Sequence, residues 1–209
     1  HPTAEYRAKA AVPHVPALEL DDGTCISESV AICRYLEALH PEPNLFGHDP
    51  KEQALIEMWT RRCEIYLANP MMLNVRFSHP ALAALEAPQP QVAEYSRVGA
   101  EKFMRLLDRQ LAEHEFIAAD RFTIADIVAA VGLDFARLVK YRPPEELTHL
   151  ARWMGDCRAR PAAKVGVCGL FRRTPSCQAA RHEQSRPDHP RPWSRRIGRR
   201  LHRHRPCAQ

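Results

Sequence analysis

Glu28 and Ser29 are the residues of this chain whose types and position best suit ligand binding. They stand where a predicted strand meets a predicted helix at residues 29–39. The unpaired N–H groups of a first helical turn and the positive end of the helix dipole attract anions, and Ser29 is a suitable N-cap. The pair therefore predicts a carboxylate-binding site. The alternative is that Ser29 only caps the helix and Glu28 is a solvated strand-end residue.

The residues before this pair predict a β-hairpin that would position it. Residues 17–20 alternate as a strand does, and residues 25–27 form the returning strand. Between them, Asp21-Asp22-Gly23-Thr24 contains the Asp-Gly signal of a two-residue hairpin turn. The helix at 29–39 has an apolar face at helical spacing and is expected to stop at His40-Pro41.

The rest of the chain divides into an α/β part, a connector and a helical part. Residues 2–9 suit a short helix, and prolines then favour extended chain up to residue 16. Residues 41–50 are rich in proline and mark a boundary. Helices are predicted beyond it, with Asn69-Pro70 ending the first, over residues 51–68, 91–114, 123–140 and 145–160.

The region around Glu28 resembles the signature of the cytosolic glutathione transferase family. The resemblance rests on Val15-Pro16-Ala17-Leu18-x-Leu20-x-Asp22-Gly23-x-x-Ile26-x-Glu28-Ser29-x-Ala31-Ile32-x-x-Tyr35-Leu36. It implies that the Val15 backbone, freed by a cis bond to Pro16, pairs with the cysteinyl part of glutathione. Glu28 and Ser29 would hold the γ-glutamyl group. His14 stands where a polar side chain often binds the glycyl end, although a loop histidine can also be merely solvated.

The same resemblance implies an architecture and a reaction. We expect a partial thioredoxin-like domain at 1–40, a linker at 41–50 and an α-helical domain at 51–164. Glutathione would be conjugated to electrophilic small molecules or used as a reductant, and a homodimer is implied. In the helical part, Thr123 and Asp126 have the spacing of a capping box and are expected to be structural.

The catalytic residue is unknown from the sequence. Family members use a hydroxyl or thiol near the end of the first strand to activate the glutathione thiol. The chain begins at His1, close before the motif, so we expect that strand to be absent. Tyr6 and Cys25 are expected in a surface helix and in the second hairpin strand, where neither suits the role. A non-catalytic member of the family, binding glutathione or a partner, is the alternative.

Composition excludes several other classes of protein. The chain is 45% hydrophobic and 26% charged, has no apolar run of spanning length, and is expected in the cytoplasm. Its seven cysteines show no paired spacing, so we expect reduced thiols, no disulfide framework and no metal site.

The tail at residues 165–209 differs from the rest of the chain. It contains eleven Arg, no Lys and only two acidic residues, so it outweighs a mildly acidic first part in the net charge of +5. We expect it to be disordered. A nucleic-acid-binding arm is the less favoured interpretation, because no binding fold is apparent, and a shifted reading frame would produce the same abrupt change in composition.

Overall fold

The computed structural model describes residues 3–11 and 14–165. Within them the chain forms two compact units, the first ending at Ile32 and the second beginning at Cys33. Apart from Val165, the tail for which we predict disorder lies outside the described residues. No helix in the described part is long and apolar enough to cross a membrane.

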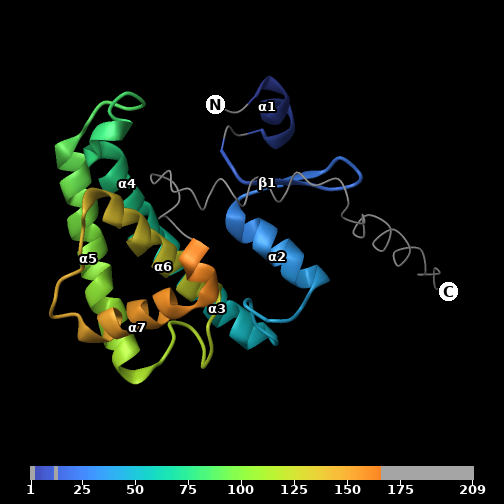
Figure 1. Cartoon of the computed structure of the whole chain (residues 1–209). Helices are drawn as coiled ribbons and strands as arrows, with labels where there is room; N and C mark the ends of the chain where they lie inside the picture. Colours follow the sequence, from blue (N-terminus) through green and yellow to red (C-terminus); the bar gives the residue numbers. More distant parts are fainter. Residues whose placement is uncertain (1–2, 12–13, 166–209) are drawn as a thin grey trace. The chain divides into compact units, whose positions relative to one another are not determined.

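The first unit is a short helix followed by a two-stranded antiparallel sheet (Figure 1). Helix α1 (Ala4–Ala10) begins after Thr3, whose hydroxyl accepts a hydrogen bond from the Tyr6 amide at 3.1 Å. Strands β1 (Ala17–Glu19) and β2 (Cys25–Ser27) pair in the register Ala17↔Ser27. Helix α2 (Ser29–Leu39) follows directly, so the predicted hairpin and helix are confirmed.

The turn of the hairpin is longer than the two residues predicted. The Gly23 amide donates to the Leu20 carbonyl at 3.0 Å, and the Leu20 amide donates to the Thr24 carbonyl at 2.8 Å. Gly23 has φ 84°, the left-handed conformation that glycine adopts without steric cost. The loop is therefore three residues with a left-handed residue last. Asp22 accepts the Thr24 amide at 2.8 Å, which lowers the pKa of its carboxyl.

The second unit is helical. Its first long helix consists of α3 (Pro50–Cys63) and α4 (Asn69–Ser78), which are joined by a π-helical turn, η1 (Glu64–Ala68). Three short 3-10 turns, η2, η3 and η4, occur later in the described part of the chain. In chain order, the elements after α2 other than η1 are α3 (Pro50–Cys63), α4 (Asn69–Ser78), η2 (Pro80–Leu82), α5 (Pro90–Glu113), α6 (Ile124–Ala136), η3 (Arg137–Val139), α7 (Thr148–Ala159) and η4 (Pro161–Val165).

The core of this unit lies where α5, α6, α7 and the long helix meet (Figure 1). Its largest fully buried side chains are those of Trp153, Ile56, Leu67, Met71, Met104, Leu107, Leu111 and Ile117. Helix α6 approaches η1 closely because residue 132 is glycine: a Cβ there would lie 2.7 Å from the Ala68 Cα.

The prediction that Asn69-Pro70 ends the first long helix is wrong. The chain stays helical through Pro70 to Ser78 because the turn before the proline is a π turn, in which the Asn69 amide donates to the Glu64 carbonyl. A proline inside a regular helix loses one hydrogen bond and meets the carbonyl four residues earlier. In the wider π turn the backbone N–H groups bond to carbonyls five residues earlier instead of four. The carbonyl that would meet the ring of Pro70 is therefore displaced, and the helix continues.

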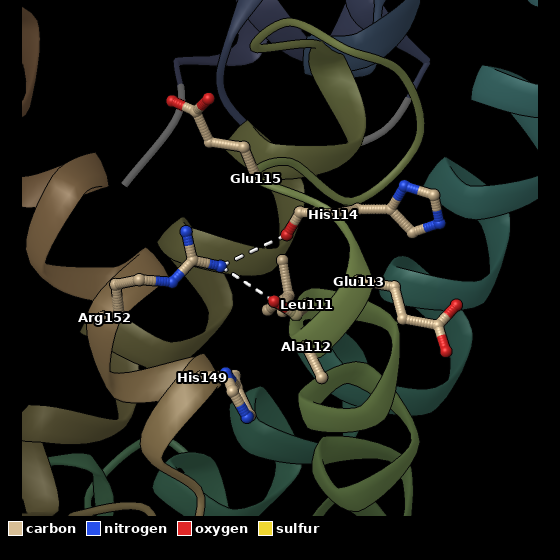
Figure 2. Close-up of a pocket in the computed structure, with 7 residues that line it drawn as sticks. All are labelled: Leu111, Ala112, Glu113, His114, Glu115, His149 and Arg152. Atoms are coloured by element: carbon tan, nitrogen blue, oxygen red, sulfur yellow. Dashed lines mark hydrogen bonds between the residues drawn. The ribbon is translucent and has the colours of Figure 1, made fainter.

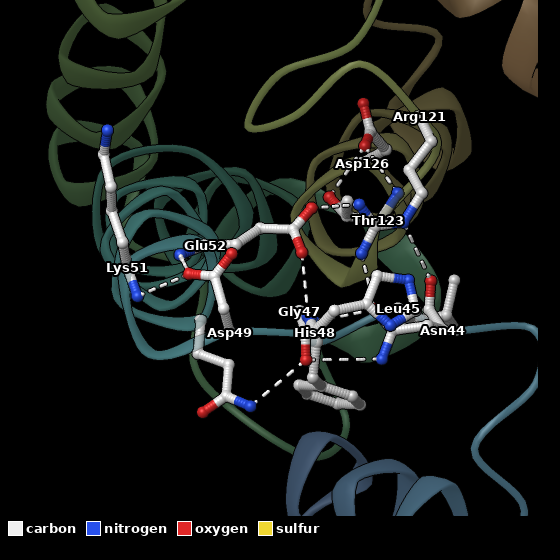
Figure 3. Close-up of polar contacts among 12 residues, drawn as sticks. Asn44, Leu45, Gly47, His48, Asp49, Lys51, Glu52, Arg121, Thr123 and Asp126 are labelled. Atoms are coloured by element: carbon white, nitrogen blue, oxygen red, sulfur yellow. Dashed lines mark hydrogen bonds and ion pairs between the residues drawn. The ribbon is translucent and has the colours of Figure 1, made fainter.

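The connector predicted at residues 41–50 is held by side chains of the second unit (Figure 3). Arg121 donates to the side-chain oxygen of Asn44 at 2.5 Å and also pairs with Glu52. Glu37 accepts the amides of Leu45 and Phe46 at 2.5 and 3.1 Å. These bonds make the connector part of the helical unit, whereas the domain limits derived from the sequence stay a prediction.

The predicted capping box of α6 is confirmed, and its carboxylate does more than cap. Asp126 Oδ2 accepts the Thr123 amide at 2.9 Å and the Thr123 hydroxyl at 3.0 Å. Asp126 Oδ1 accepts the Ile117 amide at 3.0 Å and Trp153 Nε1 at 2.9 Å. Because Asp126 is fully buried, these four donors tie the preceding loop and α7 to the start of α6.

Candidate functional site

The register of the hairpin brings the two halves of the predicted site to one end of the sheet. Ala17 is paired with Ser27, so Pro16, which precedes β1, and Glu28, which follows β2, flank that same pair. The Val15-Pro16 peptide bond is cis, as expected from the sequence. Val15 is 76% exposed, and Pro16, Glu28 and Ser29 are exposed as well. Four predicted residues therefore meet at an open edge.

The backbone of Glu28 is strained where strand becomes helix. Its φ is 69°, in the left-handed region, which costs a residue other than glycine on the order of 1–3 kcal/mol. Its carbonyl accepts the Ile32 amide at 2.9 Å, so Glu28 occupies the cap position and Ser29 is the first helical residue. The prediction of Ser29 as the N-cap is therefore wrong by one position. A left-handed residue beside a helical one turns successive N–H groups toward a common concave side, where anions bind.

His14 is positioned by a residue that the sequence did not single out for this purpose. The Tyr6 hydroxyl donates a hydrogen bond to the His14 carbonyl, which ties α1 to the segment before Pro16. Lys9 on the same helix binds the Glu19 carboxylate at 2.8 and 3.0 Å, which raises the pKa of Lys9. These two interactions join residues that are eight and ten positions apart, and the local pattern of residues 4–10 does not indicate them.

This edge offers complementary groups to a zwitterion. The exposed Glu28 carboxylate suits an ammonium group, while the free N–H groups of the first turn of α2 suit a carboxylate. The exposed backbone at Val15 leaves peptide groups available for pairing in an extended arrangement. An α-amino acid group carries both charges on one carbon, so it fits this pair of features.

Buried thiols of the helical unit do not provide a nucleophile. Burial raises the pKa of Cys63 well above its ordinary value and raises that of Cys157 to about 12. Both side chains are therefore neutral thiols, which are poor nucleophiles. Within the described residues no group of His, Cys, Asp and Glu is arranged to hold a metal ion.

A polar hollow of about 380 Å³ at the end of α5 is not a strong candidate either (Figure 2). Arg152 from α7 is its main cation, but it donates to the carbonyls of Leu111 and His114 at 2.9 and 3.2 Å. Those carbonyls belong to the last turn of α5, which has no further helical partners. Arg152 therefore caps the C-terminal end of α5, and we assign it no role in ligand binding.

Comparison with known proteins decides the family. The family model described as "Glutathione S-transferase, N-terminal domain" matches residues 1–44, and "Glutathione S-transferase, C-terminal domain" matches residues 71–161. "Glutathione S-transferase 2" of Saccharomyces cerevisiae is 36% identical over 167 residues, which are 78% of this chain and 71% of that protein. The chain belongs to the glutathione S-transferase family.

Two further similar proteins differ in how much of their length this chain spans. The crystal structure of a glutathione S-transferase domain-containing protein of Marinobacter aquaeolei is 40% identical, with a TM-score of 0.69 over 77% of this chain and 80% of that one. Elongation factor 1-gamma of Equus caballus is 26% identical over 88% of this chain, which spans only 41% of that protein.

These relationships confirm the predicted fold class: a short thioredoxin-like N-terminal sheet followed by an α-helical C-terminal domain. Members of the family use glutathione as a substrate. The roles of His14, Val15, Pro16, Glu28 and Ser29 in binding it stay predictions.

Proposed function

We propose that this protein binds glutathione at the open edge of the hairpin and transfers it to electrophilic small molecules or reduces with it. The observation that carries the proposal is the register Ala17↔Ser27, which gathers Val15-Pro16 and Glu28-Ser29 at one end of the sheet. Family membership supports the transferase reaction. Glutathione is the cosubstrate, and no metal is part of the proposal.

Each part of glutathione has a partner in this proposal. Its γ-glutamyl ammonium binds the Glu28 carboxylate, and the neighbouring carboxylate binds the Ser29 hydroxyl and the N-terminal N–H groups of α2. The cysteinyl part pairs with the Val15 backbone. His14, held through its carbonyl by Tyr6, binds the glycyl end.

Calorimetric titration with glutathione tests this assignment. The double variant Glu28→Ala, Ser29→Ala removes one charge-assisted partner and one neutral one, so we expect at least tenfold weaker binding, or about 1.4 kcal/mol. Cysteinylglycine lacks the γ-glutamyl group and should bind wild type and variant equally weakly. The variant Asp21→Ala, Thr24→Ala at the opposite end of the hairpin is the matched control. Wild-type affinity in the Glu28/Ser29 variant would contradict the proposal.

A non-catalytic protein of the same fold that binds glutathione or a partner is a second candidate function. It is supported by the Tyr6 hydroxyl, which is bonded to the His14 carbonyl, and by Cys25, which pairs with Glu19 at the turn end of the sheet. The Tyr6 hydroxyl thus has its proton engaged by a backbone carbonyl, and Cys25 is at the end of the sheet opposite to the proposed site. The relationship to elongation factor 1-gamma, whose name is not that of a transferase, supports this candidate too. Turnover of an aromatic electrophile in the presence of glutathione distinguishes the two functions.

A homodimer in the cytoplasm completes the proposal. Helices α4 and α5 lie side by side, as the hydrogen bond from Asn74 to the Ala93 carbonyl indicates. Apolar side chains exposed on them, Tyr95 of α5 at 83% and Met72 of α4 at 50%, support a self-associating face. The four free cysteines of the described residues are in line with a reducing compartment.

Light scattering during gel filtration tests the dimer. The variant Tyr95→Glu places a charge in the self-associating face, so we expect the dimer to dissociate to monomers at micromolar concentration. Leu85→Glu, at another highly exposed apolar position (73%) outside α4 and α5, is the control and should stay dimeric. A monomeric wild-type protein would overturn this part of the proposal.

A further inference from the structure

A second cavity lies wholly within the helical unit, between α6 and the end of α7. Its volume is about 310 Å³, at the small end of the range of ligand pockets. Its lining is chiefly apolar and comes from Phe122, Ile127, Ala130, Val131, Cys157 and Ala162. Val131 is 59% exposed although its neighbours on α6 are largely buried, so the cavity is open to solvent at this side chain.

The cavity is lined by two arginines, Arg158 and Arg160, and in the described part of the chain only the first is paired with a carboxylate. Arg158 is neutralised by Asp134, whose Oδ1 accepts its Nε at 3.0 Å and a terminal nitrogen at 2.8 Å. Arg160 instead has its guanidinium carbon 3.8 Å from the centre of the Phe122 ring. Among the described residues no carboxylate pairs with it. The mouth of the cavity therefore carries one cation whose donors are open to a ligand.

The floor of the cavity adds no competing charge. The Cys157 side chain is 6% exposed, and its pKa is raised to about 12 by burial, so the thiol is neutral at physiological pH. A neutral thiol behaves as a small apolar group. The interior thus suits hydrocarbon, and the favourable site for a negative charge is at the rim.

We propose that this cavity binds a small amphipathic anion, with its hydrocarbon body against Phe122, Ile127 and Ala130 and its acid group on the Arg160 guanidinium. Burial of the hydrocarbon supplies affinity, since apolar ligands gain in proportion to the surface removed from water. The Arg160 fork supplies selectivity, because it can donate two parallel hydrogen bonds to a carboxylate. A medium-chain fatty acid has this chemistry. The site shares no residue with the hairpin edge and needs no glutathione.

Titration of the full chain with decanoate, below its micellar concentration, tests this proposal. Decanol is the neutral ligand of equal length, and we expect it to bind about tenfold more weakly than decanoate. The variant Arg160→Leu should abolish this preference while keeping the weak binding of decanol. Ala130→Trp should fill the cavity and abolish binding of both ligands. Circular dichroism and thermal unfolding verify that each variant is folded.

Arg109→Leu is the matched control, because Arg109 is an exposed arginine on α5, away from this cavity. It should bind both ligands as wild type does. Failure of the wild type to bind decanoate, or an unchanged preference in Arg160→Leu, would overturn the proposal. Glutathione binding is measured separately on the same samples, so the failure of either site is recognised independently.

Discussion

Replacement of Asp126 by Ala is expected to lower the free energy of unfolding by about 5 kcal/mol. The carboxylate is fully buried and accepts four hydrogen bonds, two from Thr123, one from the Ile117 amide and one from Trp153 Nε1. Each buried donor that loses its partner costs about 1–3 kcal/mol. Because whole domains are stable by only about 5–15 kcal/mol, we expect the variant to be barely folded.

Urea unfolding followed by tryptophan fluorescence measures this loss, with Trp153 reporting directly on the site. Asp126→Asn keeps one accepting oxygen and should fall between wild type and Asp126→Ala. Asp120→Ala, at an exposed position in the preceding loop, is the matched control and should change stability by less than about 0.5 kcal/mol. A loss below about 2 kcal/mol in Asp126→Ala would show that water replaces the carboxylate at little cost.

Replacement of Gly132 by Ala is expected to destabilise the protein by about 2 kcal/mol, although alanine favours helix more than glycine does. A Cβ at this position in α6 would lie 2.7 Å from the Ala68 Cα and 2.8 Å from the Ala68 Cβ. Both atoms are fixed to the backbone of a π turn, so they cannot move aside as the end of a flexible side chain would. Helix α6 and η1 would have to separate.

Gly99→Ala in α5 and Gly155→Ala in α7 are the controls. A Cβ at either position would meet nothing within 4 Å, so the gain in helix propensity should raise stability by about 0.5–1 kcal/mol. Thermal unfolding of the three variants in parallel should therefore give one decrease and two increases. An increase for all three would mean that the crossing of α6 and η1 is loosely packed.

The sequence by itself determined the elements whose causes are local. The hairpin at 17–27, the helix beginning beside Glu28 and the Thr123–Asp126 box each depend on residues a few positions apart, and turn, strand and cap preferences act at that range. The family motif rests on the same neighbours. For this reason most of the predicted binding residues could be named before their arrangement was known.

Only the tertiary structure decided how distant residues combine. It extended the first long helix beyond Pro70 through a π turn, and it added Trp153 to the Asp126 carboxylate. It also joined the Tyr6 hydroxyl to the His14 carbonyl and opened a cavity beside an Arg160 without a carboxylate partner among the described residues. Such contacts depend on packing between elements far apart in the chain, where no local preference of residue type specifies which groups meet.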